Sequence, residues 1–195
     1  MVRKFYLVTN ESAPGLVGDA NPLPVAQDND GAVQQNLFRY LDTVGDGSGT
    51  KDAVGNYAGA VEEFKIVPAA GEVMRIHRLI VSAIDTTGMD ADKYGNGITL
   101  TNGIFVKTKN ASGTILDLTD GEPILTNGAW AHLCYDADVK TWGSGNDHLV
   151  VRWTFSKSGA PIRLVGDDGE YLSVDLNDSF AGLLGHFFMV QGVYE

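Results

Sequence analysis

Two stretches of the chain place an apolar residue at every second position, which is the period of a β-strand. The first covers residues 149–156, and its apolar positions are Leu149, Val151, Trp153 and Phe155. The second covers residues 171–176, and its apolar positions are Leu172, Val174 and Leu176. Because successive side chains of a strand point to opposite faces, each pattern predicts one face turned toward a core. Trp153 is therefore predicted to be a core residue.

Six further runs are rich in β-forming residues after residue 57. They cover residues 61–67, 73–84, 103–109, 114–118, 130–135 and 186–194. Clusters of Gly, Pro, Asn, Asp and Ser separate the runs, as at 68–71, 110–113 and 158–161. Short strands divided by such turns predict an all-β antiparallel sandwich. We expect a jelly roll, although periodicity does not separate it from an immunoglobulin-like topology. The one helical turn expected here covers residues 178–184.

The beginning of the chain has a different character. A short β-prone run covers residues 4–9, and residues 10–56 are polar, glycine-rich and without strand period. Within them, residues 33–41 carry apolar positions at near-helical spacing. So long an irregular stretch is uncommon inside a compact domain. The sequence therefore predicts two parts, a strand and extended arm over residues 1–56 and a sandwich over residues 57–195.

Apolar residues of the arm are candidates for contact with a partner, since a purely disordered tail is poorer in them. These candidates are Leu16, Val17, Leu23, Val25, Leu37, Phe38 and Leu41. Trp142 joins them because it stands in a glycine-rich segment and is expected to be an exposed interface anchor.

Composition narrows the choice of partners. The chain has a net charge of −11, so its surface repels nucleic-acid phosphate and we expect no nucleic-acid partner. No run approaches the roughly 18 apolar residues of a membrane span, so we expect no membrane partner. Cys134 is the single cysteine and excludes an intrachain disulfide, which fits synthesis in a reducing cytoplasm. The apolar run after the basic Arg3 and Lys4 is too short for a signal peptide.

Candidate chemistry is sparse. The four histidines, His77, His132, His148 and His186, lack the short spacings of a metal site. Residues 90–95 read D-x-D-x-x-G like the start of a calcium loop, but Thr101 stands where the loop needs a bidentate glutamate. Cys134 and His132 would share a strand face without a third orienting group. We expect no catalytic residue, metal or cofactor, and hence no enzyme.

Six short segments of the chain cover residues 74–82, 100–106, 115–121, 151–155, 172–178 and 188–193. They resemble segments of virion structural proteins of tailed bacteriophages, and the resemblance covers about residues 60–195. It implies a jelly-roll-like sandwich located in the virion, on the capsid, neck or tail. It also implies a homo-oligomer, with a trimer as the favoured state.

The expected function is that of a capsid decoration or cement protein. Its arm would clamp neighbouring subunits of the major capsid protein, because ordering an arm on a partner adds contact area without enlarging the core. One alternative is a neck or tail component, such as a fibre adaptor. Another is a carbohydrate-binding module for host attachment that uses Trp142 and nearby loops, although such a module would not need the long arm.

Overall fold

The structure is a computed structural model of the 195-residue chain. It describes the backbone of residues 6–7, 15–16, 35–55, 60–86, 102–119, 135–142, 146–155 and 160–195, and the side chains of these ranges from residue 35 on, except 135–142. The chain divides into two compact units, Met1–Gln34 and Gln35–Glu195. In the first unit, β1 (Tyr6–Leu7) and β2 (Gly15–Leu16) form an antiparallel pair.

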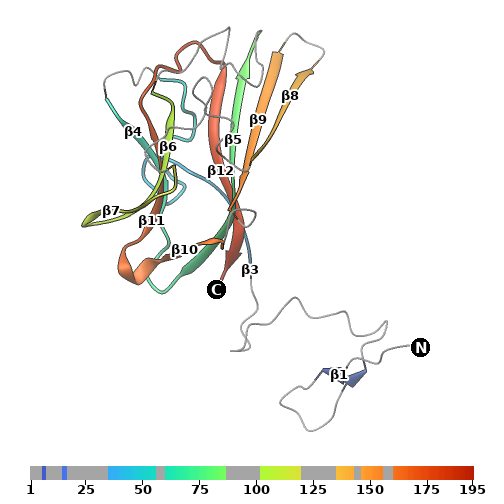
Figure 1. Cartoon of the computed structure of the whole chain (residues 1–195), viewed down its shortest axis with the longest axis vertical. Coiled ribbons are helices and arrows are strands. Elements are labelled where there is room, and N and C mark those ends of the chain that lie inside the picture. The colour runs from blue at the N-terminus through green and yellow to red at the C-terminus, as the bar shows by residue number, and fades with distance from the viewer. Residues whose placement is uncertain are drawn as a thin grey trace. The chain divides into compact units, whose positions relative to one another are not determined.

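The second unit is an antiparallel β-sandwich, which confirms the predicted fold class (Figure 1). The larger sheet has the order β3-β12-β5-β9-β8, and β10 also pairs with β5. Its strands are β3 (Gln35–Tyr40), β5 (Val73–Asp85), β8 (Tyr135–Trp142), β9 (Asn146–Thr154), β10 (Ile162–Val165) and β12 (Gly185–Tyr194). The smaller sheet has the order β4-β11-β6-β7, and its strands are β4 (Glu62–Ile66), β6 (Ile104–Asn110), β7 (Gly113–Asp117) and β11 (Tyr171–Leu176). A short 3-10 turn, η2 (Gly166–Asp168), connects β10 to β11.

The strand pairing is that of a jelly roll. Strand β3 pairs with β12, β4 with β11, β5 with β9, and β6 with β7, so the pairs are nested along the chain. Rolling up such a nested set places alternate pairs in opposite sheets, as a jelly roll requires. Strands β8 and β10 belong to the larger sheet but lie outside this set of nested pairs. The pairing settles the topology that the periodicity of the sequence left open.

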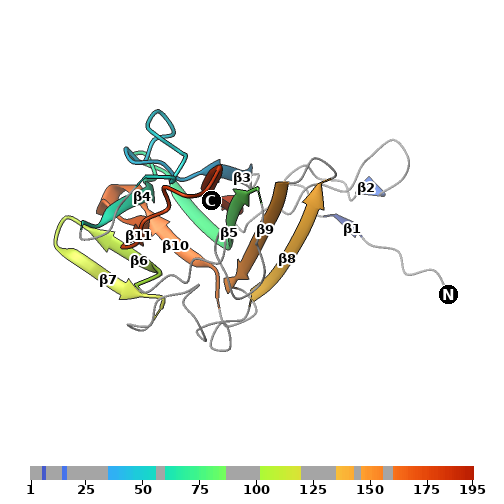
Figure 2. The same ribbon diagram turned by 90° about the horizontal axis from the view of Figure 1, so that it is seen from above.

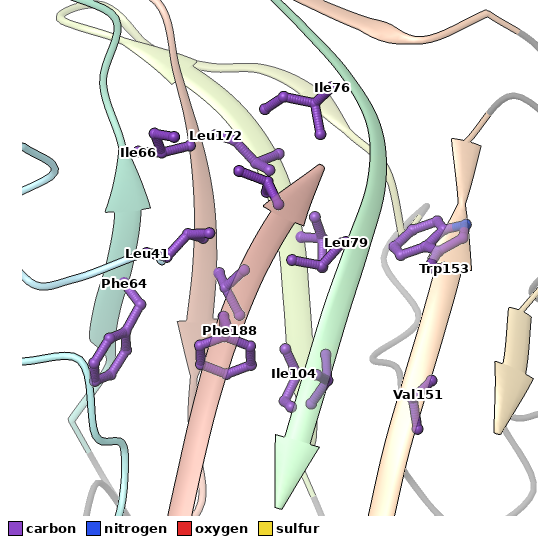
Figure 3. Packing of buried hydrophobic residues seen from close by; sticks show 14 of the residues in the cluster. Leu41, Phe64, Ile66, Ile76, Leu79, Ile104, Val151, Trp153, Leu172 and Phe188 are labelled. Carbon is purple, nitrogen blue, oxygen red and sulfur yellow. The ribbon is translucent and has the colours of Figure 1, made fainter. Parts of the chain in front are cut away.

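The core lies between the inner faces of the two sheets (Figure 3). The predicted inward positions of β9 and β11 are confirmed, since Trp153 is 6% exposed and Leu172 is fully buried. Phe188 of β12 packs against Phe64 of β4, with ring centroids 5.7 Å apart, and so joins the two sheets. The alternation seen in the sequence thus places the larger apolar side chains in one continuous core.

Strand β5 contains a β-bulge at His77. Partners of β12 jump from Arg78 to Ile76 between Gln191 and Gly192, which leaves His77 outside the register. On the opposite edge of β5, β9 pairs from Arg78 onward and β10 pairs up to Ile76. The bulge is therefore where β5 exchanges one neighbour for another. Both views place β10 beside this end of β5 (Figures 1 and 2).

The predicted boundary at residue 56 is wrong, because the sandwich unit begins at Gln35. Leu37 and Leu41 lie in the core, 2% and 0% exposed. The amide of Leu41 donates to the carbonyl of Phe188 in the larger sheet, and the next residue, Asp42, pairs with Lys65 of the smaller sheet. Two apolar residues four positions apart lie on the same side of a helix, but they also lie on the same face of a strand. Residues 35–40 form a strand.

Three other segments differ from the predicted secondary structure or lie partly outside the described residues. Residues 178–184 contain a turn, closed by the Leu183 amide on the Phe180 carbonyl at 2.9 Å, in place of the helical turn. The strand predicted over residues 130–135 falls mostly outside the described residues, and β8 begins at Tyr135. Strand β10 was not predicted, because its four residues carry too short a pattern to stand out from the turns around it.

Candidate functional site

The outer face of the larger sheet carries an apolar surface. It draws on β3, β12, β5 and the turn before β12, and its side chains are half-buried or exposed. Tyr40 lies opposite Met189 across the β3–β12 ladder, and Gly185 lies opposite Ile84 across the β12–β5 ladder. We call this surface the apolar face and define it by Phe38, Tyr40, Ile84, Leu184, Phe187 and Met189.

A shallow groove of about 390 Å³ crosses the apolar face. Tyr40 and Phe187 meet edge to face at its floor, with ring centroids 5.7 Å apart. Leu184 lines the groove with 53% of its surface exposed, and Phe38 is 56% exposed beside it on β3. Contiguous exposed apolar surface of this kind marks an interaction site more often than scattered single residues do.

The described charged side chains that border the apolar face are mostly cationic. Lys51 lines the groove with its amine 5.9 Å from the centre of the Tyr40 ring, and Arg78 and Arg152 occupy outward positions of β5 and β9. Asp52 also lines the groove, and its carboxylate accepts a hydrogen bond from the amide of His186 at 3.1 Å. Farther along the same outer face, the register places Asp136 of β8 opposite Arg152 and Asp138 opposite Val150.

A second apolar surface lies where β7 faces β10. Ile115 and Leu116 of β7 are 49% and 53% exposed, and they line a cavity of about 370 Å³ together with Pro161 and Ile162. Strand β7 is the last strand of its sheet, and among the described residues β10 pairs with β5 alone. This cavity, the edge groove, is therefore flanked by two strand edges.

The outer face of the smaller sheet carries a charged cluster instead. The amine of Lys109 lies 2.8 Å from Glu63 Oε1 and 2.8 Å from Asp175 Oδ1, and the Ser173 hydroxyl donates to Glu63 at 3.0 Å. Burial alone would raise the pKa of Glu63, but the bonds from Lys109 and Ser173 hold it below its usual value. Burial would lower the pKa of Lys109, and its two carboxylate partners raise it. The cluster is satisfied internally and covers β11.

Two buried carboxylates organise loops. Asp42 accepts hydrogen bonds from the amides of Val44, Gly45 and Gly49, and so shapes the glycine-rich segment 42–50. Asp178 accepts from the amides of Asn102 and Gly103, which ties the start of β6 to the turn before β12. Both groups have structural partners, which explains their burial without a reaction.

His186 is fully buried on the inner face of β12. Its ring stacks on Phe180 and meets Phe188 edge-on, with ring centroids 4.7 Å apart in each case. Desolvation by burial lowers the pKa of His186 to about 3. The ring is therefore a neutral member of the core at physiological pH.

The predicted interface residues divide into three groups. Phe38 is exposed and belongs to the apolar face, whereas Leu37 and Leu41 are core residues and do not reach a partner surface. Burial of these two leucines corrects that part of the prediction. The side chains of Leu16 and Trp142 are not described, and Val17, Leu23 and Val25 lie outside the described residues.

The other chemical candidates are distributed as follows. His77 sits at the bulge and His148 on β9, while His132, Cys134 and residues 90–95 lie outside the described residues. Within the described ranges, no three His, Cys, Asp or Glu side chains gather as they would around a metal ion. None of the described elements is an apolar helix of membrane-spanning length.

Sequence reasoning missed the apolar face because its residues come from three segments that lie far apart in the chain, β3, β5 and residues 184–189. Only the cross-strand register brings them together. An available signal was the pair of aromatic residues at alternate positions, Phe38 and Tyr40, which is typical of a strand with one exposed apolar side. No protein-family model, curated protein or solved structure matches this chain.

Proposed function

We propose that this protein is a non-enzymatic structural protein of a tailed-phage virion, acting as a capsid decoration or cement protein that assembles as a homo-oligomer. The observation that carries the proposal is the apolar face on the outside of the larger sheet. Two buried carboxylates, Asp42 and Asp178, hold loops in place through hydrogen bonds, which supports a structural role for them over a catalytic one.

The apolar face suits a second copy of the same chain for an electrostatic reason. Two acidic molecules repel each other over most of their surfaces, and they approach best where carboxylates are few. Among the described residues that line the groove, Asp52 is the one carboxylate and Lys51 lies beside it. The face also carries large exposed side chains, namely Phe38, Tyr40 and Leu184. Aromatic anchors surrounded by a polar rim are typical of stable protein interfaces.

The capsid-binding part of the proposal rests on the arm. Because the sandwich begins at Gln35, the arm is the unit before it, residues 1–34, which is shorter than the sequence alone predicted. In the proposed assembly this unit, which contains the β1–β2 pair, contacts a neighbouring capsid subunit.

The test of self-assembly is the Leu184→Ser variant in light scattering coupled to gel filtration. We expect the wild-type chain to form a homo-oligomer and the variant to dissociate at least tenfold more readily, since an interface leucine is lost. Leu116→Ser is the matched control, because Leu116 is also 53% exposed but lies in the edge groove.

Two results would contradict this assembly. One is a wild-type chain that stays monomeric at high micromolar concentration. The other is a Leu116→Ser variant that dissociates while Leu184→Ser does not, which would move the contact to the edge groove. Cryo-electron microscopy of purified particles then tests the location: we expect the chain on the capsid shell, and density at the neck or tail would favour the adaptor role.

A further inference from the structure

Two carboxylates stand opposite each other at one end of the core. Asp85 is the last residue of β5 and pairs in register with Asp147 at the start of β9. The inward positions of β5, which include Val81 and Ala83, continue to Asp85, and those of β9 continue from Leu149 back to Asp147. Directly opposite residues of an antiparallel pair have Cβ atoms about 4.5–5.5 Å apart. Both carboxylates therefore leave the ladder on the same, core-facing side.

One of these carboxylates is buried with a free oxygen. Asp85 is 4% exposed, and its Oδ1 accepts hydrogen bonds from the amide of Thr86 at 2.7 Å and from the Thr86 hydroxyl at 3.4 Å. Its Oδ2 is buried without any hydrogen-bond partner, and no described ion pair includes Asp85. Other buried carboxylates of this protein behave differently, since Asp42 and Asp178 are both bonded through several donors.

This arrangement is unfavourable as it stands. A buried carboxylate oxygen without a partner, such as Asp85 Oδ2, loses its hydration without compensation. A bound cation would remove this cost. Hard divalent cations are bound by carboxylate oxygens, and Ca²⁺ accepts irregular sets of six to eight oxygens that include water, whereas Mg²⁺ demands an octahedral set.

We propose that Asp85 and Asp147 form a binding site for a hard divalent cation, Ca²⁺ in particular, at this end of the sandwich. Asp85 Oδ2 is the buried ligand, and the half-exposed Asp147 supplies the second carboxylate from the solvent side. The cation would fasten the end of β5 to the start of β9, where the core-facing row of apolar residues ends.

Thermal unfolding of the full chain tests the site. Purified protein is stripped with EDTA and melted with and without 5 mM CaCl₂, at ionic strength matched with NaCl. A ligand present at about one hundred times its Kd raises Tm by roughly 5–10 °C in a domain of this size. We expect this rise for the wild-type chain and its loss in Asp85→Asn, which keeps the side-chain shape but removes the charge.

A control variant separates specific binding from general charge screening. Divalent cations screen the negative charges of any strongly acidic protein and stabilise it to some extent. Asp168→Asn removes one charge at an exposed position of η2, and it should keep the wild-type rise. Should Asp85→Asn fail to fold, Asp147→Asn replaces it, and calcium titration calorimetry at 25 °C gives the direct readout of binding. The site is refuted by a wild-type chain without a rise at 20 mM CaCl₂, or by equal rises in wild type, Asp85→Asn and Asp147→Asn.

Discussion

The neutral, buried His186 makes the stability of the sandwich depend on pH, and the variant His186→Leu should remove that dependence. Leucine has a similar volume to histidine and does not titrate, so it occupies the space between Phe180 and Phe188 without a proton equilibrium. The absolute stability of the variant is not the readout. The readout is the change of its unfolding free energy with pH.

The sign and the size follow from the two pKa values. In the unfolded chain, the imidazole binds a proton near its ordinary pKa of 6.5, whereas in the folded chain burial lowers the pKa to about 3. Above pH 6.5 neither state is protonated, and the histidine has no effect on stability. Below it, only the unfolded state binds the proton, so the free energy of unfolding falls by up to about 1.4 kcal/mol per pH unit. Between pH 8 and pH 5.5 the loss is about 1.4 kcal/mol.

Urea unfolding followed by tryptophan fluorescence measures this loss. Curves are recorded at pH 8, 7, 6 and 5.5, and the series stops there because the sequence has a pI of about 4.6 and the protein becomes poorly soluble. We expect the wild-type free energy of unfolding to be flat above pH 7 and to fall below it. The variant should lack about 1.4 kcal/mol of that fall.

An identical pH dependence in wild type and His186→Leu would refute the reasoning. It would mean that His186 takes up a proton in the folded state as readily as in the unfolded chain, and therefore that water reaches the ring. Glu63 does not interfere, because the hydrogen bonds from Lys109 and Ser173 hold its pKa below its usual value and so below the range of the experiment.

Two further predictions concern packing. Trp153→Ala should lower the free energy of unfolding by about 3–5 kcal/mol, measured by urea unfolding. The reason is that Trp153 is 6% exposed and its ring packs on that of Phe155, with ring centroids 4.9 Å apart. A loss below about 1 kcal/mol would contradict its place in the core. Gly192→Ala should cost about 1–3 kcal/mol or more in the same assay, since an added Cβ would lie 1.9 Å from the carbonyl oxygen of Arg75. Gly185→Ala on the same strand is its control, because the added Cβ would make only an ordinary 3.6 Å contact with Ile84, and equal effects of the two variants would argue against the bulge.

The sequence was sufficient to predict the antiparallel sandwich, several of its strands and the faces that these strands turn toward the core. Period-two alternation is a local property, because each side chain is directed by its own backbone. The positions of Val151, Trp153, Leu172 and Val174 in the core could therefore be read directly from the chain.

The start of the sandwich was not readable in the same way. Residues 35–40 alternate only weakly, because β3 is an edge strand whose outward positions, Phe38 and Tyr40, are aromatic as well. What fixes β3 is its ladder with β12, at the opposite end of the chain. Local pattern contains no information about a partner so distant in sequence.

The candidate sites of this protein could not be predicted from the sequence either, because their residues are also distant from one another in the chain. The sequence by itself determined an acidic, all-β chain with the larger apolar side chains on predictable faces. The pairing of Asp85 with Asp147, the cluster around Lys109 and the apolar face each join residues from separate strands. Only the register of the strands decides which residues face each other, and a shift by one residue would turn every one of these side chains to the opposite face.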